Sequence, residues 1–360
     1  MYVIKLVFIF EKQIVTMYLH YMAVQQLKMI VRKTIAGAKC KLGVYQSQYK
    51  RLGKSGNSVI LMYHRIIAPE SFAEHVEPGM YVRPETFSMH CSVLRHYFDV
   101  VPLSEIISSK DILSSKPRCA ITFDDGWADF YQNAFPILKA AHLPSTVYLP
   151  TNFIGTDMQF WTDTCAAILK KICHEKPELP YQGTSPVIRE ILQIKGDYIS
   201  CVDSVIKMLK PYSTGEIKKI LDELAQYAGC SHTSLQTFMT WNEVKTCLDS
   251  GLVAFGSHTV NHLILTAESR QTVHDELRIS KEKLIKEQVA DPSDISFCYP
   301  NGGYSQEITQ MVKMAGYSSA VTTKTGWNSA MSERYNLRRI GMHQDMTSTR
   351  SLIMARLAMQ

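Results

Sequence analysis

The chain lacks the features that mark several classes of protein. Its 360 residues contain no internal repeat and no low-complexity tract. With 46% hydrophobic and 20% charged residues the composition is that of an ordinary soluble protein, which excludes a disordered, collagen-like or multi-pass membrane chain. The nine cysteines form no CxxC pair, so neither a secreted disulfide scaffold nor a cysteine zinc finger is expected.

Acidic residues are almost missing from the first 56 positions. This segment has ten Lys or Arg against the single acid Glu11, a net charge of +9, whereas the rest has 29 Lys or Arg against 32 acids, a net charge of −3. We therefore expect a basic leader over residues 1–56 and a nearly neutral body. A nucleic acid is not an expected partner, because the basic residues are not on the body.

The leader also has apolar residues at near-helical spacing, at positions Ile14, Tyr18, Tyr21, Val24, Leu27, Ile30, Val31 and Ile35. They predict either an amphipathic helix in peripheral contact with an anionic membrane, or a helix that packs on the body or is disordered. The apolar run from Tyr2 to Phe10 is too short to span a bilayer, and it lacks the basic start and nearby cleavage site of a signal peptide. A cytoplasmic or membrane-peripheral location is therefore favoured over secretion.

The body alternates between two kinds of pattern. Short apolar runs typical of buried strands occur at 59–63, 100–101, 118–123, 145–149, 252–255, 295–299 and 317–321. Helical patterns separate most of them, which predicts an α/β fold with a parallel sheet or barrel. Between about 156 and 238 only helical patterns occur. We expect a main domain over residues 57–345 with a helical insertion at 156–238, and a C-terminal tail over 346–360.

Two carboxylates follow one of these strands directly. Asp124 and Asp125 stand after the apolar run 118–123 and before Gly126. Active sites of α/β folds form at the carboxyl ends of parallel strands. Two adjacent carboxylates repel one another unless a cation or a shared proton relieves them. The alternative is a plain strand-end turn in which one Asp caps the following helix.

Two histidines follow another strand. His258 and His262 are four residues apart, so on one helical turn both imidazoles would reach the same metal ion. With Asp125 they would form a set of two histidines and one carboxylate, which suits a divalent metal with open positions. The alternative is a loop with two exposed histidines.

Four segments together resemble the polysaccharide deacetylase family, also called the NodB-homology family or carbohydrate esterase family 4. They are Thr122 to Gly126 (TFDDG), Thr240 to Val244 (TWNEV), Ser257 to His262 (SHTVNH) and Phe297 to Gly302 (FCYPNG). The resemblance runs from about Val59 to Met342 without the insertion. It implies a distorted (β/α) barrel that hydrolyses N-acetyl groups of an amino sugar in a polysaccharide or lipid-linked glycan.

The resemblance also implies a role for individual residues. Asp124 would be the general base, and a divalent metal ion, most often zinc, would be held by Asp125, His258 and His262. A metal lowers the pKa of bound water and polarises a carbonyl, which an amide needs in order to be hydrolysed at neutral pH. The residues that would contact the N-acetylated glycan, in part through backbone N–H groups, are Tyr299, Asn301 and Gly302.

The sequence departs from the family pattern at two places. Many members have an arginine that orients the base where this chain has Cys298. We expect Arg339 to replace it, with a surface salt bridge as the alternative role. The late histidine that acts as general acid is best matched by His343, and His64 is the other candidate.

Two other functions share these residues. A metal-dependent hydrolase of a non-sugar amide or cyclic imide would use the same metal and base. A glycan-binding relic of the fold would have lost the base or a ligand, and the sequence retains both aspartates and both histidines.

Overall fold

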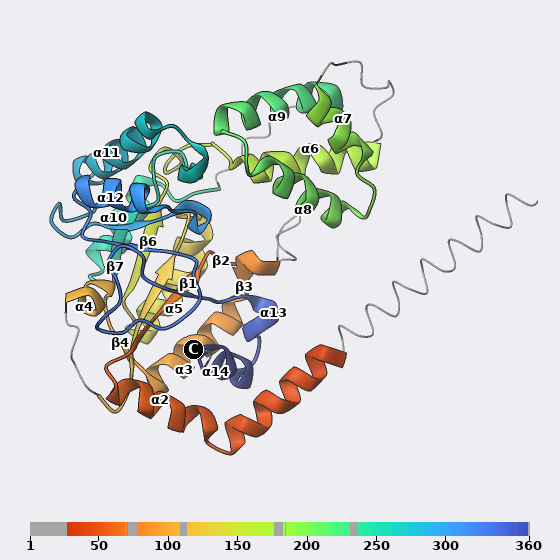
Figure 1. Ribbon diagram of the computed structural model, residues 1–360. Coiled ribbons are helices and arrows are strands. Elements are labelled where there is room, and N and C mark those ends of the chain that lie inside the picture. The colour runs from red at the N-terminus through yellow and green to blue at the C-terminus, as the bar shows by residue number, and fades with distance from the viewer. Residues whose placement is uncertain are drawn as a thin grey trace, which may run out of the picture.

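The computed structural model describes residues 27–68, 70, 78–108, 114–175, 183, 185–230 and 237–358. Its centre is a curled parallel sheet (Figure 1), built from the strands β1 (Ser58–Tyr63), β4 (Asp99–Val100), β5 (Arg118–Phe123), β6 (Ser145–Leu149), β7 (Val253–Ser257), β8 (Ser296–Cys298), β9 (Ser319–Val321) and β10 (Ile340–Gly341). The neighbour order is β10-β1-β5-β6-β7-β8-β9, and β4 pairs with β5. A parallel bridge between Val321 and Leu337 joins the β9 edge to the segment before β10. The predicted distorted (β/α) barrel is confirmed.

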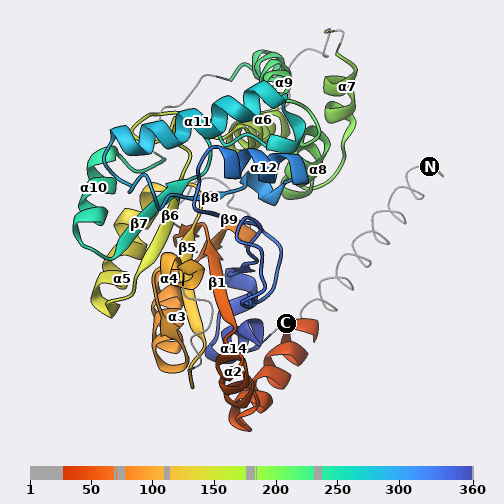
Figure 2. The same cartoon turned by 60° about the vertical axis from the view of Figure 1, so that its left-hand side comes forward.

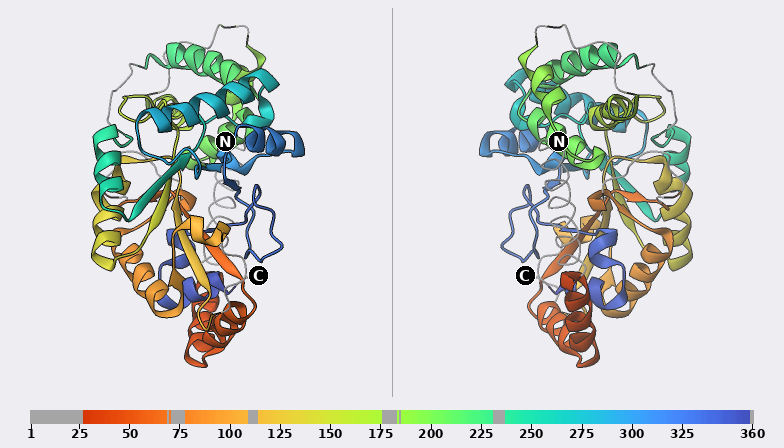
Figure 3. Two further views of the ribbon diagram at one scale, coloured as in Figure 1. Left: turned by 90° about the vertical axis from the view of Figure 1, so that its left-hand side faces the viewer. Right: turned by 90° about the vertical axis from the view of Figure 1, so that its right-hand side faces the viewer.

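The central strands are mostly apolar because both faces of the sheet are covered. Every residue of β1, β5 and β6 is buried. The side views in Figure 3 show helices around the outside of the strands. These helices are α3 (Pro84–Tyr97), α5 (Phe135–Ala141), α10 (Trp241–Asp249), α11 (Arg270–Lys286) and α12 (Gln306–Met314). The short helix α4 (Leu103–Ser108) packs against the other face of the sheet, with Ile60 and Ala120.

One predicted helix differs in its geometry. The helical pattern at 129–141 becomes a π-helix, η3 (Phe130–Ala134), followed by α5. Pro136 lies in the first turn of α5 and has no N–H for the regular hydrogen bond to residue 132, which accounts for the wider turn. The turn follows Asp125 in the chain and leads the backbone away from the sheet.

The insertion forms a second, helical layer with its own core. Its helices are α6 (Trp161–Glu175), α7 (Pro186–Gln193), α8 (Tyr198–Leu209) and α9 (Thr214–Ala228). Their apolar residues, among them Ile168, Val205 and Leu224, form a cluster separate from the core of the barrel. Figure 1 shows this lobe beside the barrel. It contacts the barrel loops through two polar pairs, Lys210 with Asn301 and Thr214 with Glu268.

Short elements complete the side of the sheet where β1 ends. The strands β2 (Arg65–Ile66) and β3 (Tyr81–Val82) form a two-stranded parallel sheet, and η2 (Pro78–Met80) directly precedes β3. The turns η4 (Leu265–Ala267) and η5 (Pro300–Gly302) follow β7 and β8, and α13 (Gln344–Thr347) follows β10. The loops after the strands therefore gather at one end of the barrel.

Both flanks of the predicted main domain pack onto it. The helix α2 (Val44–Lys54) buries Tyr45, Tyr49 and Leu52, and the Tyr49 hydroxyl donates a hydrogen bond to the Met354 carbonyl. Met354 belongs to α14 (Arg350–Leu357), whose apolar side chains lie in the core. The packed domain therefore extends from at least residue 44 to 357, beyond the predicted limits of 57 and 345. Residues 1–26 of the predicted leader lie outside the described residues.

Among the described residues, no helix combines the length and the apolar character needed to cross a bilayer.

Candidate active site

The residues singled out in the sequence converge at the carboxyl ends of neighbouring strands. Asp124 follows β5, His258 follows β7, and Cys298 ends β8. Arg339 precedes β10, which pairs with β1 next to β5. Because the strands are parallel, their ends lie at one edge of the sheet, and side chains far apart in sequence meet there.

Asp124 and Arg339 form a buried, two-pronged ion pair. Each carboxylate oxygen of Asp124 accepts a hydrogen bond of 2.7 Å from one guanidinium nitrogen of Arg339. Arg339 is fully buried, and it also donates to the Thr322 carbonyl and the Thr122 hydroxyl. These bonds fix the plane of the guanidinium and thereby the plane of the carboxylate. Arg339 therefore orients Asp124 and is not a surface residue.

The ion pair keeps Asp124 ionised. Burial alone would raise the pKa of the Asp124 carboxyl, but the adjacent Arg339 guanidinium outweighs burial and holds the pKa below its usual range. Cys298 lies on the same guanidinium, with Sγ 3.2 Å from Nη2. Burial raises the pKa of the Cys298 thiol, so Cys298 fills space here as a neutral side chain.

Asp125, His258 and His262 form a second cluster beside this pair. One carboxylate oxygen of Asp125, Oδ1, lies 3.4 Å from Nε2 of His258 and 3.3 Å from Nε2 of His262. The other oxygen accepts a hydrogen bond from the Trp127 indole. Asp125 has a left-handed backbone with φ 74°, which turns its side chain toward the histidines although Asp124 precedes it directly.

This cluster fits a metal ion in three respects. The three ligand atoms lie within 4.8 Å of one another. Oδ1 of Asp125 is buried and makes no hydrogen bond among the described residues. Nδ1 of His258 lies 2.8 Å from the Cys298 carbonyl, which can only accept, so Nδ1 carries a hydrogen and Nε2 is the nitrogen that remains for a metal ion beside Asp125.

A competing set of ligands is less suitable. Asp124, His258 and Cys298 also bring possible ligand atoms within 4.8 Å of one another. In that set both Asp124 oxygens are already bonded to Arg339, and Arg339 also contacts the Cys298 sulfur. A second cation there would lie against a guanidinium, so the set with Asp125 suits a metal ion better.

The two histidines come together in a different way from the predicted one. Residues 258–262 form a loop and not a helical turn, so that prediction is wrong. Thr259 and His262 have φ values of 67° and 55°, and these left-handed residues fold the loop so that both imidazoles face Asp125. The two rings lie 4.8 Å apart, and Phe160 packs on the ring of His262.

Glu276 holds this loop and was not identified in the sequence. Its buried carboxylate accepts hydrogen bonds from the N–H groups of Val260 and Asn261 and from the Asn261 side chain. The sequence signal that could have identified Glu276 is a charged residue on the inner side of α11, because a buried carboxylate needs hydrogen-bond partners. Glu276 therefore fixes the backbone between the two histidines.

Of the predicted substrate-binding residues Tyr299, Asn301 and Gly302, only Asn301 has a side chain that is exposed to solvent. The Tyr299 hydroxyl donates to the Tyr335 carbonyl, and the Gly302 N–H donates to the Tyr299 carbonyl, so both groups are occupied. Gly302 has φ 70°, and a Cβ there would lie 1.9 Å from the Thr323 hydroxyl. Glycine is thus required by packing on the protein itself, where the sequence suggested a ligand. Asn301 is exposed beside Lys210 of the insertion.

The two histidine candidates for the general acid occupy different positions. Nε2 of His64 lies 3.8 Å from Oδ2 of Asp124. His343 follows β10 and lies close enough to His64 for the two charges to interact, but burial is the main cause that lowers its pKa. His64 therefore contacts Asp124, whereas His343 is a neighbour of His64.

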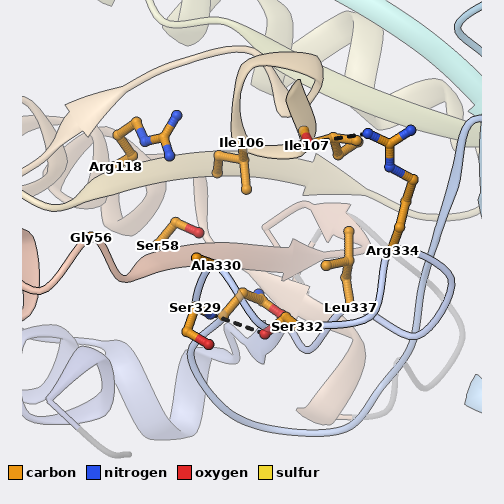
Figure 4. A pocket seen from close by; sticks show the side chains of 11 residues that line it. Gly56, Ser58, Ile106, Ile107, Arg118, Ser329, Ala330, Ser332, Arg334 and Leu337 are labelled. Atoms are coloured by element: carbon orange, nitrogen blue, oxygen red, sulfur yellow. Dashed lines mark hydrogen bonds between the residues drawn. The ribbon is translucent and has the colours of Figure 1, made fainter. Parts of the chain in front are cut away.

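A hollow elsewhere on the molecule contains none of these residues. It lies where β1 and β5 begin, and Figure 4 shows Ser58 and Arg118 with Arg334 and Leu337 around it. Asp124 follows the opposite end of β5. The hollow is therefore separate from the candidate active site.

Comparison with known proteins identifies the family. The model of the polysaccharide deacetylase family matches residues 113–185 and 201–320, more than half of the chain. YxkH of Bacillus subtilis, a protein assigned to the polysaccharide deacetylases, is 24% identical over 306 residues, which are 84% of this chain and 77% of YxkH. The poly-beta-1,6-N-acetyl-D-glucosamine N-deacetylase of Staphylococcus epidermidis is 30% identical over 118 residues, which are 30% of this chain and 41% of that enzyme.

Solved structures share the fold. The Streptococcus pyogenes deacetylase PplD, solved with acetate, aligns with a TM-score of 0.53 and 21% identity over 84% of this chain and 98% of its own. IcaB of Ammonifex degensii aligns with a TM-score of 0.51 and 14% identity over 85% and 99% of the two chains. The two segments that match the family model contain both the Asp124–Asp125 pair and the two histidines. The chain belongs to the polysaccharide deacetylase family of hydrolases that act on carbon–nitrogen bonds.

Proposed function

We propose that the chain is a metal-dependent deacetylase that removes N-acetyl groups from an amino sugar in a polysaccharide or lipid-linked glycan. The observation that carries this proposal is the pairing of two clusters. Asp124 is held by Arg339, while the buried Oδ1 of Asp125 faces two histidines. One carboxylate is thus arranged for proton transfer and the other for binding a metal.

Asp125, His258 and His262 would hold one divalent ion, and zinc suits two imidazoles and a carboxylate. When bound, such an ion supplies Lewis acidity toward the amide carbonyl and toward the attacking water. His258 is ready for this role because its Nδ1 donates to the Cys298 carbonyl. Trp127 fixes the other oxygen of Asp125, so that one oxygen is left for the ion.

Asp124 would accept the proton of the attacking water. A general base has to be ionised, and the pKa of Asp124 is held below its usual range by Arg339. The amine leaves only after it receives a proton, which the nearby imidazole of His64 can deliver. The products are acetate and a free amino sugar. We assign the delivery to His64 because of its contact with Asp124, with His343 as the alternative.

The glycan would extend over the loops at this end of the barrel. Asn301 is exposed there, and Lys210 and Thr214 of the insertion contact the barrel loops next to it. The insertion therefore supplies one wall for a long substrate. The similarity to an N-deacetylase of poly-β-1,6-N-acetyl-D-glucosamine supports a polymer of N-acetylglucosamine as the first substrate to test.

The test is acetate release from a panel of acetylated compounds. The purified full-length chain is incubated with poly-β-1,6-N-acetyl-D-glucosamine, with chitin oligomers and with a non-sugar acetamide, and acetate is quantified enzymatically. The proposal expects acetate from at least one glycan and none from the simple amide. Hydrolysis of the simple amide alone would identify a hydrolase of non-sugar amides. No acetate from any compound, with metal bound, would contradict the deacetylase proposal.

A further inference from the structure

The first described helix, residues 27–41, lies at the margin of the molecule. Figures 1 and 2 show it beside α14, and no other described element covers its outer side. A helix on the surface of a soluble protein normally turns its apolar stripe toward the core and its polar side toward water. In helix 27–41 the large apolar side chains face outward, and small or polar groups face the body.

The side that contacts the body is narrow and made of small or polar groups. Ala36 is buried, and Cys40 contacts the sulfur of Met354. Arg32 donates a hydrogen bond of 3.2 Å to the carbonyl of Met346, three residues after His343. These residues recur every four positions, so they form one stripe along the helix. The stripe attaches the helix to α13 and α14 without using its large aliphatic side chains.

Those large side chains point outward. Exposed fractions are 60% for Leu27, 60% for Ile30, 48% for Val31, 51% for Ile35 and 79% for Leu42. At 3.6 residues per turn the first four of these share one side of the helix, and Leu42 comes directly after its last residue. A contiguous apolar strip of this kind on a surface marks a binding site for a protein or a membrane.

The charges around the strip indicate which of the two it is. Residues 27–42 contain five cations and no acid, and Lys28, Lys33 and Lys39 are exposed. With about 100° between successive residues, Lys28 and Lys39 lie at one border of the apolar strip and Lys33 at the other. The exposed Lys41 falls within the strip, at the last residue of the helix. Lysines at the borders of an apolar strip complement acidic headgroups while their stems lie along the acyl region.

We propose that this strip, defined by Leu27, Ile30, Val31, Ile35 and Leu42, binds the surface of an anionic lipid bilayer. The helix lies in the plane of the interface, with the aliphatic side chains below the headgroups and the lysines among them. The inner stripe stays on α13 and α14, so the barrel remains attached to the bound helix. This inference concerns binding alone and does not depend on the deacetylase activity.

The test is co-sedimentation of the full-length chain with vesicles. One set is made of phosphatidylcholine alone and the other of equal parts phosphatidylcholine and phosphatidylglycerol. The proposal expects binding to the second set only, weakening as salt increases toward 1 M, where the Debye length falls to about 3 Å. Equal binding to both sets, or no binding to either at low salt, would overturn it.

Variants then separate the lipid surface from other partners. Ile30→Asn with Ile35→Asn should weaken vesicle binding by at least about tenfold for each side chain removed from the bilayer. Lys28→Gln, Lys33→Gln and Lys39→Gln together should weaken it about 100-fold, or about fivefold per cation. The matched control replaces two exposed apolar residues elsewhere, Met314→Asn and Met331→Asn, and should bind as the parent does.

Two further readouts keep the result unambiguous. All variants should keep the far-UV circular dichroism of the parent, because none of the changed side chains is buried. The mass of the parent in solution is measured by light scattering. If the parent is a dimer that the Ile30→Asn and Ile35→Asn changes dissociate, while vesicle binding is unaffected, the strip is an interface between two copies and the membrane proposal is wrong.

Discussion

Arg339 and Asp124 are 215 positions apart in the chain, yet their side chains form two hydrogen bonds of 2.7 Å in the buried centre of the barrel. The sulfur of Cys298 contacts the same guanidinium. The family resemblance led us to expect an orienting arginine at the position of Cys298, and in this chain the cation beside Asp124 comes from the segment before β10. A small side chain at position 298 leaves the space that Arg339 fills.

Loss of this cation should change the pH dependence of the reaction. Asp124 acts as an anion, so activity is present above its pKa and is lost as pH falls through it. Arg339 lowers that pKa, and Arg339→Gln should therefore move the acidic limb of the kcat/KM profile upward by about 1–3 pH units. The control is Arg338→Gln, whose side chain is exposed. An unchanged acidic limb in Arg339→Gln would show that Asp124 is not the titrating base.

The same relationship predicts a rescue. A double variant with Cys298→Arg and Arg339→Ala returns the cation to the position that other family members use. It should recover part of the activity that Arg339→Ala alone loses, with metal content unchanged in both. If the double variant is folded and no more active than the single one, the two positions are not interchangeable sources of the cation.

Glu276 should affect metal binding without touching the metal. Its carboxylate holds the N–H groups of Val260 and Asn261, between His258 and His262. Groups that orient metal ligands typically contribute about 10–100-fold to affinity, so Glu276→Gln should weaken zinc binding by about that factor in a competition titration. Glu282→Gln changes an exposed carboxylate on the same helix and should leave the affinity unaltered. Equal zinc affinity in all three proteins would reduce Glu276 to a packing role.

The general acid can be assigned by comparing two variants. His64→Asn should reduce kcat by about 10²–10⁴-fold, because the leaving amine then lacks its proton donor. His343→Asn should reduce it less, because His343 has no contact with Asp124 among the described residues. A substrate with a leaving group that needs no protonation should restore the activity of the affected variant. The reverse order of losses would make His343 the donor.

Site residues that directly follow an apolar strand could be predicted from the sequence. Those that depend on loop conformation or on contacts between distant segments could not. Apolar runs followed directly by Asp124 and by His258 indicated strand ends that meet at one edge of a parallel sheet. The loop that joins the histidines was predicted as a helical turn, because left-handed residues at Thr259 and His262 leave no periodic signal. Glu276 could not be paired with this loop, since its partners are backbone N–H groups of residues 15 and 16 positions away.

At the ends of the chain, too, local helices could be predicted from the sequence but long-range contacts could not. Charge and apolar spacing predicted a helix in the leader, and helix 27–41 lies there. They did not predict that Tyr49 of α2 and Met354 of α14 meet across 305 positions. Such contacts depend on how the barrel closes, which local patterns do not encode. The limits of the packed domain therefore had to come from the structure.

In the proposed reaction one carboxylate of the Asp124–Asp125 pair transfers the proton and the other binds the metal. The most direct measurement is zinc content and acetate release on the same samples of the parent, Asp124→Asn and Asp125→Asn, after chelation and stepwise return of zinc. The parent should regain activity as zinc returns, up to one ion per chain. Asp124→Asn should bind that ion yet release acetate about 10²–10⁴-fold more slowly, and Asp125→Asn should lose both. Full activity in the zinc-free parent, or equal loss of metal in both variants, would contradict this division of roles.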